Sequence, residues 1–78
     1  MEYTLDADKM NDKKTAHEHM KEVFEFPDYY GMNLDALNDC LSAMNIETIN
    51  IVNSDKGQLY FYSILDVFEN LGININMQ

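Results

Sequence analysis

The chain has 78 residues, of which 46% are hydrophobic and 24% charged, a composition typical of one small globular domain rather than of a disordered segment. Five basic residues, all lysine, stand against 14 acidic ones, so the formal net charge is −9. This charge argues against binding to nucleic acid or to an anionic membrane, which both need a positive patch, and favours either a basic partner or simply solubility.

The N-terminal residues predict a strand followed by a turn. Tyr3 and Leu5 alternate with polar residues, which indicates a short strand with one apolar face. Residues 6–12 are polar and turn-like, and either Asn11 or Asp12 can cap the helix that follows.

The first predicted helix covers residues 13–25. Its apolar residues form one stripe, made of Ala16, Met20, Val23 and Phe24. Pro27 ends the helix just before it, because the residue preceding a proline disfavours the helical conformation. His17 and His19 are two residues apart and point in different directions on a helix, so we expect structural or solvent-exposed roles rather than a shared metal.

A loop and a second helix follow. In the loop, Gly31 suits either a positive φ or a close backbone approach, and Asn33 can cap a helix predicted over residues 34–44. At about 100° per residue, the apolar third of this helix holds Leu34, Leu37, Cys40, Leu41 and Met44. The opposite side holds Asp35, Asn38, Asp39 and Ser42. The helix therefore has a core face and an open face, and we expect Cys40 to be a buried small hydrophobe.

The second half of the chain predicts a strand, a helix and a strand. Residues 46–52 alternate around isoleucines, residues 59–71 carry a helical apolar stripe that Gly72 can end, and residues 73–77 alternate isoleucine with asparagine. The order β-α-α-β-α-β predicts a three-stranded parallel sheet. Because the strands alternate, we expect helices on one face only, in a two-layer α/β domain over residues 1–78.

The sequence offers little for catalysis. It has no Gly-rich phosphate loop, nucleophile elbow, C-x-x-C pair or calcium-binding loop, so we expect no enzyme, no cofactor and no metal site. A single cysteine excludes an intramolecular disulfide, and the first residues have no signal-peptide character. We therefore expect a cytoplasmic protein.

Asp35 and Asp39 are neighbours on the open helix face, where like charges cost about 0.2–0.5 kcal/mol. Two carboxylates held side by side can receive a cation, and they follow Tyr29, Tyr30 and Gly31 directly. Tyrosines are enriched in interfaces, so a loop with aromatic anchors beside a carboxylate pair predicts a protein-binding surface for a basic site. An ordinary solvated helix face is the alternative.

Residues 27–41, Pro-Asp-Tyr-Tyr-Gly-Met-Asn-Leu-Asp-Ala-Leu-Asn-Asp-Cys-Leu, closely resemble the signature segment of the barstar family, intracellular inhibitors of barnase-type ribonucleases. The element order and the pair Val67-Phe68 agree with that family, whereas similarity elsewhere is weak and the region between the second and last strands is shorter. The resemblance implies a small parallel sheet covered by helices, the fold expected from the alternation.

The resemblance also implies a function. The protein would plug the active-site cleft of a basic extracellular-type ribonuclease with acidic side chains in place of RNA phosphates, as an immunity protein that is monomeric when free. By position, Asp39 would enter the catalytic pocket and Asp35 would support it. The remaining contact positions are Tyr29, Tyr30, Gly31, Asn33, Leu34, Asn38, Ser42 and Glu69.

The periphery of this surface departs from the family pattern. Asn38 and Met44 stand where the barnase inhibitor has tryptophans, and Glu69 precedes the expected acidic position, which is Asn70 here. We therefore expect a different target nuclease and weak inhibition of barnase. One alternative is a barstar-like module for a non-nuclease toxin or a regulatory partner. A more remote one is a metal-binding or enzymatic domain that uses Asp28, Asp35 and Asp39.

Overall fold

The alternating segments form one parallel sheet. The computed structural model of the protein describes residues 2–78, and Met1, included in the domain predicted over residues 1–78, lies outside them. The strands are β1 (Glu2–Asp6), β2 (Thr48–Val52) and β3 (Asn74–Met77), and the helices are α1 (Lys13–Phe24), α2 (Leu34–Ser42) and α3 (Leu59–Asn70). Two short 3-10 turns, η1 (Ala7–Lys9) and η2 (Ser54–Lys56), follow β1 and β2. The predicted order β-α-α-β-α-β is confirmed.

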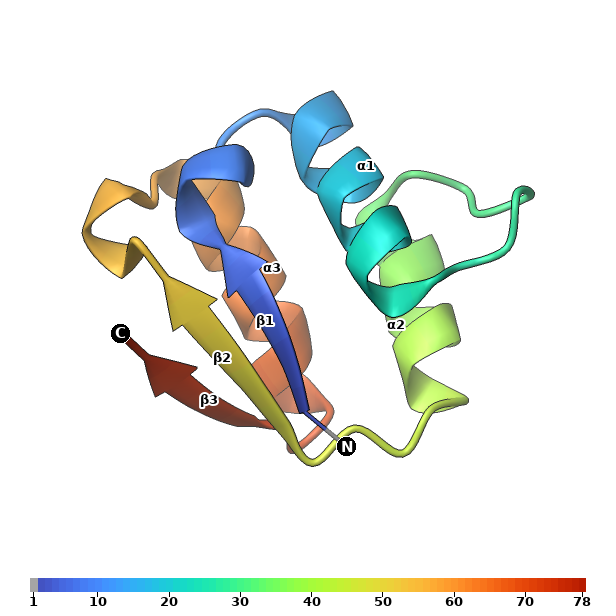
Figure 1. Ribbon diagram of the computed structural model, residues 1–78. Coiled ribbons are helices and arrows are strands. Elements are labelled where there is room, and N and C mark those ends of the chain that lie inside the picture. The colour runs from blue at the N-terminus through green and yellow to red at the C-terminus, as the bar shows by residue number, and fades with distance from the viewer. Residues whose placement is uncertain (1) are drawn as a thin grey trace.

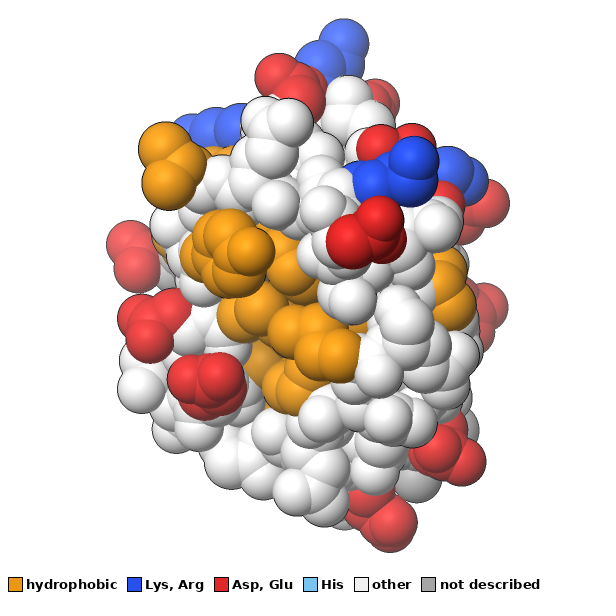
Figure 2. Space-filling model, turned by 90° about the vertical axis from the view of Figure 1, so that its left-hand side faces the viewer, with side chains coloured by type: hydrophobic (Ala, Val, Ile, Leu, Met, Phe, Trp, Pro, Cys, Tyr) orange, Lys and Arg blue, Asp and Glu red, His pale blue; other side chains and the backbone are white. Residues whose placement is uncertain are grey.

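The sheet has the order β1-β2-β3, with both pairs parallel. Leu5 lies opposite Ile51, and Ile49 opposite Ile75, so apolar residues line up on one face. The three helices lie on that face, and the other face is open (Figure 1). The predicted two-layer α/β fold is therefore confirmed. Along the side where β3 lies, hydrophobic side chains gather in a surface patch (Figure 2).

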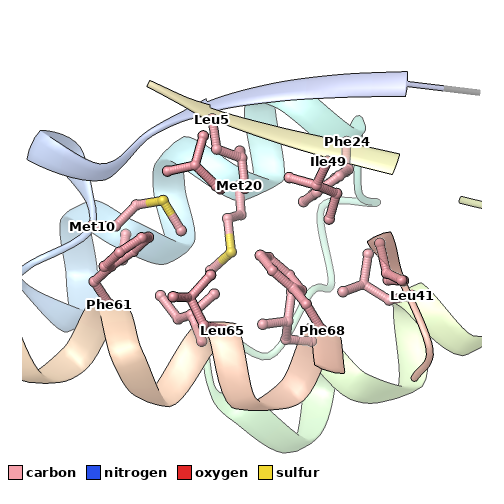
Figure 3. Close-up of a cluster of buried hydrophobic side chains, with 14 of the residues drawn as sticks. Leu5, Met10, Met20, Phe24, Leu41, Ile49, Phe61, Leu65 and Phe68 are labelled. Carbon is pink, nitrogen blue, oxygen red and sulfur yellow. The ribbon is translucent and has the colours of Figure 1, made fainter. Parts of the chain in front are cut away.

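The core lies between the sheet and the helices. Leu5 and Ile49 point down from the strands, while Met20 of α1 lies between them and the α3 side chains Leu65 and Phe68 (Figure 3). The prediction of a polar turn over residues 6–12 is wrong in part. Ala7 and Met10 are fully buried, because η1 folds that segment back over the helices. Within residues 2–78, no helix is long and apolar enough to cross a bilayer.

Local capping determines where the helices begin and end. Asp12, one of the two predicted caps, accepts a hydrogen bond from the Thr15 N–H at 3.0 Å. At the end of α3, Gly72 has a φ of 75°, and the Ile73 N–H donates to the Phe68 carbonyl at 3.1 Å. The predicted helices extended one or two residues too far, since Glu25, Ala43 and Leu71 already are the C-caps of α1, α2 and α3.

Candidate functional site

The start of α2 is held by Asn33. Its backbone is extended, its Oδ1 accepts the Ala36 N–H at 2.8 Å, and its Nδ2 donates to the Gly31 carbonyl at 3.2 Å. The side chain therefore satisfies a free N–H of the first helical turn and also ties the loop to the helix. The predicted N-cap is confirmed, and it places the side chains of α2 at defined angles to the loop.

The division of α2 into two faces is confirmed. Leu37 and Leu41 are buried, and Leu34 and Cys40 pack against the core while remaining partly accessible. Cys40 is therefore less buried than predicted. The opposite side is exposed along its length and comprises Asp35, Asn38, Asp39 and Ser42.

The two carboxylates of α2, Asp35 and Asp39, lie on exposed residues and form no ion pair within residues 2–78. The Ser42 hydroxyl donates to the Asp39 backbone carbonyl at 2.9 Å, which leaves the Asp39 carboxylate unengaged. Because their Cβ atoms are fixed by one helical turn, this pair needs little reorganisation to receive a cationic group.

The two tyrosines of the loop differ in their exposure to solvent. Tyr29 is 88% exposed, as an aromatic anchor for a partner would be, whereas Tyr30 is only 5% exposed. The Tyr30 side chain is thus part of the core in this structure, and its predicted contact with a partner stays a prediction. The Tyr30 ring packs against Phe26 with a centroid distance of 4.6 Å, and its N–H closes a turn onto the Pro27 carbonyl.

A buried histidine ties this loop to the rest of the fold. His17 of α1 is fully buried, with Nδ1 at 2.7 Å from the Tyr30 hydroxyl and Nε2 at 2.6 Å from the hydroxyl of Tyr60 on α3. One ring nitrogen carries the proton, so one tyrosine accepts a hydrogen bond and the other donates one. The structural role expected for His17 is confirmed, but its two partners were not predicted. His19 is also structural, since its Nε2 accepts the Asp6 N–H.

The stability of the protein should fall as the pH drops below about 6.5. Burial, with help from nearby lysines, lowers the pKa of His17 and of His19 from 6.5, so the folded protein takes up these protons less readily than the unfolded chain. Below that pH the unfolded state binds more protons, and the free energy of unfolding decreases by up to about 1.4 kcal/mol per pH unit for each histidine. Urea unfolding at several pH values measures this slope. A constant free energy of unfolding from about pH 8 down to pH 5 would contradict the prediction.

The left-handed residue of the loop is not the glycine. Met32 has a φ of 56°, whereas Gly31 is not among the residues with positive φ. The other expectation for Gly31, a close approach of the backbone to a neighbour, is confirmed. A Cβ at this position would lie 3.1 Å from the Ala36 Cβ, a tighter approach than ordinary contact. Gly31 thus lets the loop lie close against the first turn of α2.

A pocket of about 350 Å³ lies between the loop and the C-terminal half of α2. Tyr29 and Pro27 line it on the loop side, and Cys40, Ala43 and Met44 line it on the α2 side. It is open to solvent and mostly apolar, so it can accept an apolar or aromatic side chain of a partner. No feature of the sequence pattern predicted it.

The remaining predicted positions are less closely tied to this surface. Glu69 is exposed on α3, and α3 packs against α2. Asp28 lies 3.9 Å from Lys21 in a solvent-exposed ion pair. Within residues 2–78, no three acidic, histidine or cysteine side chains lie close enough together to hold a metal ion. The structure therefore does not assemble the set Asp28, Asp35 and Asp39 that a metal site would use.

The fold and this surface define a small two-layer α/β protein that presents an acidic helix face beside an exposed aromatic residue of the loop, a surface that a partner protein can contact. A family model described as "Barstar (barnase inhibitor)" matches residues 1–74, and the chain belongs to that family. A protein of Bacillus subtilis (strain 168) named "Putative ribonuclease inhibitor YrdF" is 45% identical over 38 residues. That match covers 49% of this chain and 42% of the relative, so it spans less than half of either protein.

Proposed function

We propose that the protein inhibits a basic extracellular-type ribonuclease by blocking its active-site cleft. The observation that carries the proposal is the exposed pair Asp35 and Asp39, which forms no ion pair within residues 2–78 and lies on the helix that follows the exposed Tyr29. Membership of the barstar family supports a ribonuclease as the partner. The mechanism requires neither catalysis nor a cofactor.

The acidic side chains would replace RNA phosphates in the cleft. Asp39 would receive the arginine, lysine and histidine donors that bind the scissile phosphate, since charge-assisted hydrogen bonds to a carboxylate are strong in a desolvated site. Asp35, one turn earlier, would add to the negative potential. The cleft walls would contact the loop and the start of α2 through Tyr29, Gly31, Asn33 and Leu34.

The rim of the surface determines which nuclease fits. Asn38 and Ser42 give this rim a small, polar character, and Met44 lines the pocket beside Tyr29. A partner side chain could enter this pocket, whereas a tryptophan at position 38 or 44 would instead project from the inhibitor. We therefore propose a target other than barnase, held by the same central carboxylates and by a different rim, with Glu69 as an outer contact. The inhibitor would act in the cytoplasm and protect the producing cell.

Inhibition assays against a panel of basic secreted ribonucleases test this function. We expect stoichiometric inhibition of at least one enzyme, with an association rate that falls as salt rises, because the charge of −9 attracts a basic enzyme and salt screens the attraction beyond about 10 Å at 0.1 M. Ribonucleases with acidic surfaces are the control and should not be inhibited. If no basic ribonuclease is inhibited at protein concentrations well above those of the enzymes, the proposal is wrong.

A second candidate is a binding module for a non-nuclease toxin or a regulatory protein. It is favoured by Asn38, which replaces a large aromatic contact in the middle of the open face, and by the burial of Tyr30. A pull-down from the source cell distinguishes the two functions. Recovery of a basic protein without ribonuclease activity, lost with Asp39→Ala, would favour the second candidate.

A further inference from the structure

Another open pocket lies between α1 and the loop before α2, and we call it the α1 pocket. Its volume is about 530 Å³, larger than the pocket of about 350 Å³ beside Tyr29. It is bounded by residues 18–25 at the end of α1 and by residues 26–32 of the loop, which leaves α1 and returns to α2 (Figure 1). Glu25 and Phe26 line both pockets, so the two pockets are adjacent. A partner that covers α2 and Tyr29 therefore has the α1 pocket at its margin.

The floor of the α1 pocket is apolar and its rim is acidic. Phe26 and Tyr30 are 8% and 5% exposed and Met32 is half-buried, so these three side chains form the floor. The acidic lining residues are all exposed and form the rim; they are Glu18, Glu22, Glu25 and Asp28. An apolar hollow with a few charged groups around it is the usual form of a binding pocket, and it differs from a plain solvated helix face.

One lysine also lines the α1 pocket, but it does not neutralise the rim. Lys21 is half-buried, and its Nζ lies 3.9 Å from a carboxylate oxygen of Asp28. Within residues 2–78, the other three rim carboxylates form no ion pair. Two of them, Glu18 and Glu22, are one turn apart on α1, where like charges repel each other. The rim therefore carries more negative charge than Lys21 can balance.

The net charge of the molecule is concentrated on the same side. Four lysines and four aspartates lie in residues 6–14 and 54–56, which include η1, the start of α1 and η2, and their charges cancel. The remaining ten acidic residues and one lysine carry the whole net charge of −9. Seven of those ten lie in residues 18–47, which include the α1 pocket, the loop and α2. A basic molecule is therefore attracted to this side rather than to the η1 and η2 end.

Two residues of the α1 pocket have an unfavourable backbone conformation. Within residues 2–78, the non-glycine residues with positive φ are Asn53, whose type adopts this region readily, and Glu25 and Met32, at 57° and 56°. Glu25 also places a negative charge at the C-terminal end of α1, where the helix dipole disfavours it and glycine is the usual residue. Costs of this kind are concentrated at functional sites. Both residues line the α1 pocket.

We propose that the α1 pocket receives an arginine side chain of the basic protein that covers α2; that this protein is a ribonuclease rests on the proposed function. The apolar stem of an arginine packs on Met32 and Phe26, and its planar head offers five N–H donors to the rim. Carboxylates from both α1 and the loop surround the pocket, which suits a head that donates in several directions. An acidic or a purely apolar side chain would leave the rim carboxylates without a cation.

The α1 pocket would help to determine which enzyme is inhibited. Asn38 gives the open face of α2 a small polar rim, so a partner gains little contact area there. An arginine in the α1 pocket adds a contact outside that face, on the other side of the loop. The protein should therefore select ribonucleases that carry an arginine beside their active-site cleft as well as basic residues within it.

An NMR titration with N-acetyl-arginine amide tests the pocket without a nuclease. We expect saturable shifts of the amide signals of Glu22, Glu25 and Met32 at millimolar concentrations of this probe, and Glu25→Gln should remove most of them. N-acetyl-citrulline amide has a similar shape without the charge and is the control, which should leave these signals almost unchanged. Equal shifts with both probes, or no saturable shift at these three residues, would overturn the proposal.

Inhibition kinetics with a ribonuclease that the protein inhibits test the contact with the partner. Glu22→Gln combined with Glu25→Gln should speed dissociation roughly tenfold, because a short-range charge contact is lost. Asp8→Asn combined with Asp55→Asn is the matched control, since it removes the same charge from exposed residues of η1 and η2. It should slow association slightly and leave dissociation unchanged. Equal effects of the two double variants would overturn the proposal, because only net charge would then matter.

Glu25→Gly separates binding from folding. It should raise the midpoint of thermal unfolding, because glycine suits the left-handed cap of α1, and it should still speed dissociation. Unchanged dissociation in the Glu22 and Glu25 variants, from an enzyme whose inhibition Asp39→Ala abolishes, would overturn the role of the pocket and leave the proposed function intact. If no ribonuclease is inhibited, the proposed function fails, and the arginine titration still decides whether the pocket binds this side chain.

Discussion

Replacing Asp39 by alanine should raise the inhibition constant against a cognate ribonuclease by roughly 30-fold to several thousand-fold, while the free energy of unfolding stays equal or rises. The binding loss corresponds to about 2–5 kcal/mol, the general cost of truncating one partner of a buried, hydrogen-bonded charge pair. The range includes measurements on the barnase–barstar complex, so the size of the expected binding loss comes from that family and not from this chain.

The opposite effect on stability follows from the geometry of α2. Asp39 is exposed, and its carboxylate makes no ion pair within residues 2–78. Its removal relieves the repulsion from Asp35 one turn earlier, and alanine is the better helix former. A variant that binds poorly but folds at least as well as the wild type would show that the carboxylate serves binding.

Asp55→Ala is the matched control, because it removes one exposed carboxylate from η2, on the far side of the molecule from α2 (Figure 1). It lowers the negative charge equally, so it should slow association slightly and leave dissociation unchanged. Equal inhibition by Asp39→Ala and the wild type would exclude the proposed role of Asp39. Equal losses in both variants would show that only net charge matters.

Replacing His17 by alanine should lower the free energy of unfolding by about 3–5 kcal/mol, because it leaves a cavity and removes the partner of two tyrosine hydroxyls. The ring is fully buried and lies between Tyr30 and Tyr60, at 2.7 and 2.6 Å from their hydroxyl oxygens. Burial raises the pKa of both tyrosines, so both hydroxyls stay protonated at neutral pH. Without His17, each would be a buried hydroxyl that lacks this hydrogen-bond partner. The free energy of unfolding of a domain of this size is on the order of 4–12 kcal/mol, so the variant would be close to unfolding.

Urea unfolding measures this effect, with Glu18→Ala as the control on the same helix. Glu18 is exposed next to His17, and its removal should change the free energy of unfolding by less than about 0.5 kcal/mol. Tyr60→Phe should cost an intermediate amount, because it removes one hydroxyl and leaves the ring packing in place. A loss below about 1 kcal/mol for His17→Ala would mean that the loop and α3 do not depend on this link.

The pattern of α2 was predictable because each position depends on its neighbours within one or two turns. Asn33 caps the helix through the Ala36 N–H, and the spacing of Leu37 and Leu41 places Asp35 and Asp39 on the other side. Capping and apolar spacing involve residues only a few positions apart, so both can be read from the sequence. The three strands were predictable for the same reason, since alternation depends only on adjacent residues.

The loop before α2 followed no such rule. Tyr29 and Tyr30 are adjacent and identical in type, yet one is exposed and the other buried. The difference comes from His17 and Tyr60, and Tyr60 lies 43 residues from His17 in the chain. A loop has no period from which burial can be inferred, so only the packing of α1 and α3 decides which ring turns inward.

The sequence by itself determined the order of the elements, the acidic open face of α2 and the membership of a binding-protein family, because short-range spacing and a long ungapped motif carry that information. The tertiary structure alone decided which tyrosine is exposed, how a buried histidine ties the loop to α3, and that β3 lies at an edge of the sheet. These features depend on contacts between residues far apart in the chain, and no local pattern specifies such contacts.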